Sequence, residues 1–175
     1  MDLGALREFC SDDDRPLINT PWVAGNYIYA TDGKALARLP ALEHPALLSV
    51  IEKREYPKAE ELFKKTPMPV EFLPCPELPK MPKEKITPCD RCSGEGEVEC
   101  PHCKQYMDCP DCKGDCETGR QPVRRVTVAG IDFDARLLYR FKKHFPDFEI
   151  GPNGERVAAR IRFKGGEGLL MPMVR

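Results

Sequence analysis

The sequence contains no apolar run long enough to cross a bilayer, and it does not open with a charged-then-apolar leader. These absences predict a protein without a membrane span or an export signal, so we expect a cytoplasmic location. Net charge is lacking too: 27 Lys and Arg balance 28 Asp and Glu, which leaves −1. A nearly neutral chain has no global attraction for nucleic acid, so DNA binding requires a local basic patch.

Groupings typical of catalytic sites are also scarce. The three histidines are scattered along the sequence at positions 44, 102 and 144, and His44 stands before a proline, as in a loop. No serine or cysteine outside the cysteine-rich segment has an evident base partner, and no glycine-rich loop joins a strand to a helix. We therefore expect a non-enzymatic protein without a small-molecule substrate.

Cysteine, by contrast, is concentrated in one segment, because seven of the nine cysteines lie in residues 89–116. Three C-x-x-C pairs and one further cysteine make up the set: Cys89 and Cys92, Cys100 and Cys103, Cys109 and Cys112, then Cys116. A C-x-x-C knuckle points two sulfurs at one ion, and two knuckles complete a tetrahedral zinc shell. Without a signal peptide, this pattern favours zinc in a reducing compartment over disulfides. We expect the zinc ligands to come from these seven cysteines, four of which form one site.

The spacing leaves two questions about the zinc open. A second site could use Cys116, completed by His102 or a carboxylate. The pairing is also open, because the Cys109–Cys112 knuckle could close either on Cys100 and Cys103 or on Cys89 and Cys92. The segment is too short and polar for a core, which favours a structural role for the metal. Acidic residues outnumber basic ones over 83–120, so a protein suits this segment better than DNA as a partner.

The first knuckle continues as Cys92-Ser-Gly-Glu-Gly96 and completes a C-x-x-C-x-G-x-G motif. This motif resembles the cysteine-rich domain of the J-domain co-chaperones, in which glycines let the backbone turn tightly around the metal. The second unit here lacks the glycines, the third keeps only Gly114, and Cys116 replaces the fourth. The resemblance implies an alternative function as a protein–protein adaptor that acts through the zinc module.

The rest of the sequence predicts an α+β fold. We expect a short helix over 1–10, strands over 17–39 around a Thr31-Asp32-Gly33 turn, and helices over 46–54 and 58–65. A strand, a helix ended by Pro146 and further strands fill residues 123–175. The predicted organisation is a first half-domain (1–65), a proline-rich connector (66–88), the zinc module (89–120) and a second half-domain (121–175).

Both half-domains resemble the bacterial DNA polymerase sliding clamps. Residues 29–37, YATDGKALA, look like the clamps' ATDGxRLA hairpin, and residues 169–175, LLMPMVR, look like their C-terminal VMPMRL strand. Residues 126–150 are similar to the strand–helix–strand opening of a clamp half-domain. The resemblance covers residues 1–40 and 123–175, and implies a single sliding-clamp-like domain of two β-rich halves, each with a helix. The zinc-knuckle module is then an insertion.

This resemblance implies contact with double-stranded DNA, because clamps line their central hole with helices that present basic side chains. Arg136, Arg140 and Lys143 share one helix face, and Lys142 lies at its edge. An ordinary solvated face is the alternative interpretation of this pattern. The implied role is in DNA replication or repair, and a mimic that withdraws partners from another clamp is a further alternative.

The resemblance also implies a pocket for the short peptides of clamp partners, built from the TDG hairpin and the MPM strand. By position its residues are Thr31, Gly33, Lys34, Leu36, Met171, Pro172 and Met173. Methionine suits such a pocket because its unbranched chain adapts to varied ligands. In the family these motifs lie on adjoining domains, so we expect one chain to form the pocket only by head-to-tail self-association. A closed ring would need about six copies, and a monomer or dimer is the alternative.

Overall fold

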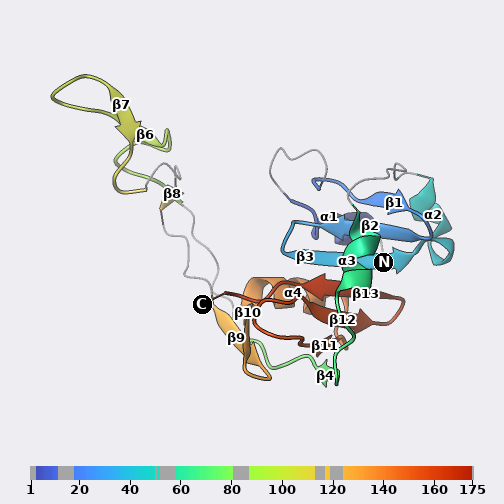
Figure 1. Cartoon of the computed structure of the whole chain (residues 1–175). Coiled ribbons are helices and arrows are strands. Elements are labelled where there is room, and N and C mark those ends of the chain that lie inside the picture. The colour runs from blue at the N-terminus through green and yellow to red at the C-terminus, as the bar shows by residue number, and fades with distance from the viewer. Residues whose placement is uncertain are drawn as a thin grey trace. The chain divides into compact units, whose positions relative to one another are not determined.

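The computed structural model describes residues 3–11, 18–49, 51, 58–80, 87–112, 117–118 and 124–174. The chain divides into two compact units, one of residues 1–79 with 124–175 and one of residues 80–123 (Figure 1). The predicted α+β class is confirmed, since short helices accompany a mostly antiparallel sheet. In the described ranges, no helix has both the length and the apolar character needed to span a membrane.

A seven-stranded sheet forms the first unit, with the order β1-β2-β3-β13-β12-β11-β4 and antiparallel neighbours throughout. Its strands are β1 (Trp22–Ala24), β2 (Tyr27–Thr31), β3 (Ala35–Pro40), β13 (Gly166–Leu170), β12 (Ala159–Phe163), β11 (Glu149–Gly151) and β4 (Leu73–Pro74). Strand β4, which the proline-rich segment contributes to this sheet, lies at the sheet edge, where proline's missing N–H breaks no ladder.

The turn between β2 and β3 follows directly from its sequence. Asp32 accepts hydrogen bonds at Oδ1 from the main-chain N–H groups of Lys34 and Ala35, both at 2.8 Å. Thr31 accepts one at Oγ1 from the N–H of Gly33, at 3.0 Å. Gly33 adopts φ +90°, a left-handed conformation that costs glycine little. The predicted Thr-Asp-Gly hairpin therefore forms.

The helices of the first unit are short. They are α1 (Leu3–Arg7), α2 (Pro45–Leu48), α3 (Ala59–Lys65) and α4 (Ala135–His144), with a 3-10 turn, η1 (Ala41–Glu43). The longest, α4, begins after Asp134, whose side chain accepts the N–H of Arg136 at 2.9 Å. Of the helix predicted over 46–54, the structure describes one turn, α2; residues 50 and 52–57 lie outside the described residues.

The two halves of this unit repeat one pattern, a helix followed by three antiparallel strands. The first half is α1-β1-β2-β3 and the second is α4-β11-β12-β13. They join through β3 and β13, where Leu36 lies opposite Leu169. The strand that follows the helix in each half, β1 or β11, is therefore the one farthest from this junction within its half. A hairpin of β9 (Arg125–Val128) and β10 (Ile131–Asp134) leads into α4.

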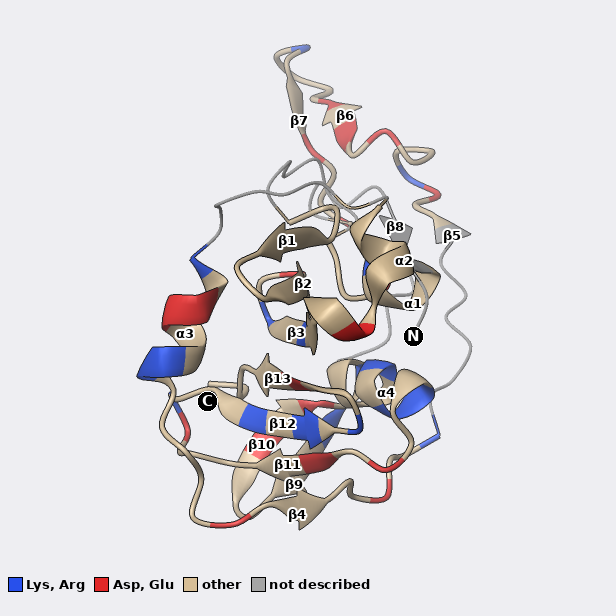
Figure 2. Ribbon diagram, turned by 90° about the vertical axis from the view of Figure 1, so that its right-hand side faces the viewer, with Lys and Arg blue, Asp and Glu red and all other residues tan. Residues whose placement is uncertain are grey.

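Helices cover both faces of the sheet (Figure 2). Gly168 and Leu169 are consecutive in β13, so they face opposite sides. On the Gly168 side lies α4: a Cβ on Gly168 would come within 2.9 Å of the Phe141 ring, which packs edge-on against Phe9, with centroids 4.9 Å apart. On the Leu169 side lies α3, whose Phe63 belongs to the same buried cluster as Leu169.

The second unit contains two antiparallel pairs of strands. Strand β5 (Thr87–Pro88) pairs with β8 (Glu117–Thr118), and β6 (Glu97–Glu99) pairs with β7 (Tyr106–Asp108). Its buried cluster consists of four cysteines, with Val98 packed against them. Because its buried cluster consists of thiols, the stability of this unit depends on what those thiols bind.

Candidate functional sites

Four thiols of the second unit converge on one point. The Sγ atoms of Cys89, Cys92, Cys109 and Cys112 all lie within 4.8 Å of one another, and the four residues are buried. Cys89 Sγ is 3.7 Å from Cys109 Sγ, and Cys92 Sγ is 3.7 Å from Cys112 Sγ. A Zn–S bond of about 2.3 Å gives a tetrahedral S···S edge of about 3.8 Å. The cluster therefore has the size of a zinc shell.

The backbone around Cys92 is arranged to favour a thiolate. Gly96 donates its N–H to Cys92 Sγ at 3.3 Å. Gly94 and Gly96 have φ of +87° and +82°, as a tight turn around a metal requires. Burial raises the pKa of the Cys92 thiol, but the N–H groups of Gly96 and Gly94 and the neighbouring thiols outweigh it, so the pKa falls to about 7. Metal ligation needs this deprotonated form.

The structure selects one of the two knuckle pairings left open by the spacing. In the β6–β7 hairpin, Gly96 accepts the N–H of Cys109 at 2.8 Å, which brings the third knuckle beside the first. Cys100 follows β6 into the loop, where its N–H bonds to Gln105, at the opposite end of the hairpin. The antiparallel register thus places Cys89 and Cys92, rather than Cys100 and Cys103, with Cys109 and Cys112.

Cys100 and Cys103 form a separate knuckle at the hairpin loop. Cys100 is half-buried and Cys103 is exposed. The N–H groups of Cys103 and His102 lower the pKa of the Cys100 thiol, so this knuckle too favours a thiolate. Cys116, the seventh predicted ligand, lies outside the described residues.

An apolar pocket of about 250 Å³ lies in the first unit between the sheet and α3. Its lining consists of Ile18, Trp22, Thr31, Gly33, Lys34, Ala35, Leu36, Ala59, Leu62, Thr66, Ala158, Leu169 and Met171. Five of the residues predicted for a peptide pocket are in this list. Pro172 and Met173 are not: Pro172 is buried, and Met173 donates its N–H to Asp132.

The expectation that this pocket needs two copies of the chain is wrong. Strands β3 and β13 are sheet neighbours within one unit, and the N–H of Met171 donates to the carbonyl of Lys34 at 2.9 Å. The hairpin and the C-terminal segment therefore meet inside a single chain. Sequence comparison by motif order could not show this, because pairing between distant strands is decided by the whole sheet.

The outer wall of the pocket, α3, was not assigned to any site from the sequence. Arg160 holds its C-terminal end, donating from Nη2 to the carbonyl oxygens of Thr66 (2.8 Å) and Phe63. Arg38, which is buried, bonds Glu60 of α3 at 2.6 Å and also Glu167 of β13. The apolar spacing of Ala59 and Phe63 was the sequence signal for this packing.

The predicted basic face of α4 carries acidic partners. Arg136 pairs with Asp134 at 2.8 Å, Arg140 with Asp32 at 2.6 Å, and Lys143 with Glu8 at 2.7 Å; these three bridges join α4 to β10, to the TDG hairpin and to the end of α1. The four predicted DNA-binding residues, with Tyr139 and Glu8, surround one shallow hollow. The structure therefore brings the four basic residues together, but acidic partners within the chain neutralise much of their charge.

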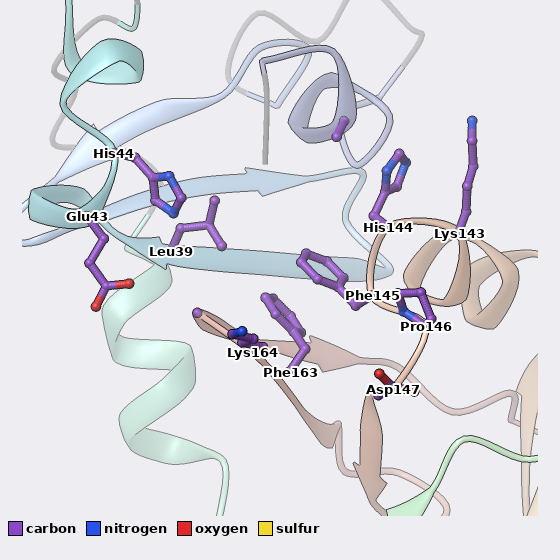
Figure 3. A pocket seen from close by; sticks show the side chains of 12 residues that line it. Leu39, Glu43, His44, Lys143, His144, Phe145, Pro146, Asp147, Phe163 and Lys164 are labelled. Atoms are coloured by element: carbon purple, nitrogen blue, oxygen red, sulfur yellow. The ribbon is translucent and has the colours of Figure 1, made fainter.

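The structure also brings together two histidines that lie far apart in the sequence. His44 and His144 line one cavity of about 710 Å³ (Figure 3). The rings of Phe145 and Phe163 stack between its walls, with centroids 3.5 Å apart. His144 Nε2 lies 2.9 Å from a carboxylate oxygen of Glu8. Within the described part of the chain, the four cysteines are the only His, Cys, Asp and Glu group that converges tightly enough to share an ion.

The fold and sites define an α+β domain with an apolar pocket on its sheet and a cysteine-built unit inserted in its sequence. No protein-family model, no curated protein and no solved structure matches this chain.

Proposed function

We propose that this protein is a non-enzymatic, clamp-like domain that binds short peptide segments of partner proteins in the apolar pocket. The observation that carries the proposal is the convergence of the TDG hairpin, Leu169 and Met171 on one cavity. These are the two segments whose sequences resemble the peptide-binding parts of sliding clamps. The zinc module is a metal-stabilised insertion in this proposal.

The arrangement of secondary structure supports the clamp-like part of the proposal. The half-domain of the clamps that this sequence resembles opens with a strand, a helix and a strand. Here β10, α4 and β11 follow in the same order. The helix and three strands occur twice, and the two sets meet at β3 and β13. A repeated half-domain is what the resemblance implies.

The pocket suits an apolar side chain carried on an extended segment. Its walls are mainly aliphatic and aromatic, and two flexible side chains stand at its rim, Leu62 (53% exposed) and Met171 (44% exposed). Exposed apolar side chains around a concave site favour binding of an apolar group. Lys34, also in the lining, adds one cation that attracts an acceptor or an acidic residue of the peptide.

The proposal is tested by selecting blocked hexapeptides from a displayed library on the full chain and measuring their affinity by calorimetry. Leu62→Glu places a charge at the pocket rim and should weaken binding at least about tenfold, because a bound apolar group would cover that charge and remove its contact with water. Leu42→Glu is the matched control: Leu42 is 87% exposed and is not among the lining residues. Selection of no peptide, or equal loss in both variants, contradicts the proposal.

DNA contact by α4 is a second candidate, favoured by the gathering of Arg136, Arg140, Lys142 and Lys143 around one hollow. The acidic partners predict weak binding that salt removes. Changing Lys142 and Lys143 to glutamate should abolish retention on double-stranded DNA at low salt. The same change at Lys64 and Lys65, both exposed on α3, alters net charge equally and should not. Equal losses in both double variants would exclude a site on α4.

A further inference from the structure

We propose that the occupant of the apolar pocket must supply a hydrogen-bond acceptor, a peptide carbonyl, to the indole N–H of Trp22. This inference rests on the proposed function and specifies the ligand of that site. Trp22 lines the pocket and is 1% exposed. Of the buried side-chain nitrogen and oxygen atoms in the described residues, Trp22 Nε1 is the one without a hydrogen-bond partner.

An unpaired buried donor is unusual, because it has lost its bonds to water without replacing them. Trp22 is held in this state by its packing. Its ring stacks on Tyr29, with centroids 5.5 Å apart and an interplanar angle of 17°. The neighbouring polar group is satisfied, since the Tyr29 hydroxyl donates to Glu60 at 2.9 Å. The indole is therefore fixed with an unpaired donor, on a residue that lines an apolar pocket.

This donor restricts the chemical class of the ligand. A purely apolar molecule can fill the pocket but leaves the N–H unpaired, whereas an extended peptide offers a carbonyl beside each side chain. The N–H is covered by protein atoms in the structure, so we expect an occupant to displace a side chain before the hydrogen bond forms. Met171 is suited to this, because it is unbranched and half-exposed. We expect binding to require an apolar side chain and an adjacent carbonyl together.

The chain contains a single tryptophan, so an analogue incorporated in its place changes Trp22 alone. Benzothienylalanine keeps the bicyclic shape and replaces the N–H by sulfur. In the ligand-free protein the analogue should raise the melting temperature, because it removes an unpaired buried donor. With a blocked hexapeptide selected on the natural chain, affinity should fall about tenfold, as for a lost hydrogen bond that no water replaces.

Benzene serves as the control ligand, because it has no acceptor and should bind both chains equally. Equal peptide affinity for both chains overturns this inference and leaves the proposed function standing. A lower melting temperature of the analogue protein also overturns it, since the N–H would then be paired without ligand. If no peptide binds either chain, the proposed function fails and the inference with it.

Discussion

The main-chain N–H of Met171 donates a hydrogen bond to the carbonyl of Lys34 at 2.9 Å. These residues are far apart in the sequence: Lys34 belongs to the TDG hairpin and Met171 to the C-terminal segment. The bond extends the pairing of β13 with β3 by one residue beyond Leu170. It thereby fixes the C-terminal segment at the pocket rim, within one copy of the chain.

Arg160 should be important for the stability of the pocket wall. Arg160→Ala removes its bonds to the carbonyls of two buried residues, Phe63 and Thr66, and its pairing with Glu167. We expect a loss of about 2–3 kcal/mol in the free energy of unfolding, measured by urea denaturation. The control is Arg162→Ala in the same strand, whose exposed pair with Glu149 should contribute no more than about 1 kcal/mol. Equal losses would mean that Arg160 does not anchor α3.

The four-cysteine cluster should bind one metal ion without the second knuckle. Cys109→Ser removes a buried thiol of the cluster, so the purified protein should hold no tightly bound metal ion there, and residues 87–112 should lose hydrogen-exchange protection. Cys103→Ser should retain one tightly bound ion per chain, because Cys103 lies on the other knuckle. Metal analysis after dialysis measures both. Loss of that ion in Cys103→Ser would contradict the observed pairing.

Acid should weaken the contact between the ends of α1 and α4. Hydrogen bonds from Lys143 and then His144 lower the pKa of Glu8 below its ordinary 4.5. A lowered native pKa stabilises the fold above the ordinary value, and this contribution disappears as pH falls through the native pKa. Glu8→Gln should therefore be less stable than the natural chain at pH 6, and this difference should be smaller at pH 3. A stability difference that does not change between these pH values would contradict the assignment.

Much of the local structure could be predicted from residues close in the sequence. The hairpin at Asp32 and Gly33 follows from side-chain bonds within three residues and one positive φ. The start of α4 follows from Asp134 as its cap. The α+β class followed from the short helices predicted beside strands around the Thr-Asp-Gly turn. These features depend on hydrogen bonds between residues close in the sequence, so they can be predicted from the sequence.

Features that join distant segments could not be predicted in this way. The sequence allowed two partners for Cys109 and Cys112, and the register of the β6–β7 hairpin selected one. His44 and His144, a hundred positions apart, face one cavity because β3 and the end of α4 lie together. The acidic partners of the α4 arginines and lysine were missed for the same reason, since two of them, Asp32 and Glu8, come from the other half of the unit.

The cysteine spacing by itself determined that this protein can hold a metal, because a C-x-x-C knuckle directs two sulfurs to one ion whatever surrounds it. Residues close in the sequence likewise determined the TDG turn and the start of α4 at its Asp134 cap. Only the tertiary structure decided which knuckles share an ion, that α3 closes the apolar pocket, and that Trp22 stands there with an unpaired N–H. The reason is that strand register and helix packing minimise the free energy of the whole chain, and no short segment contains that information.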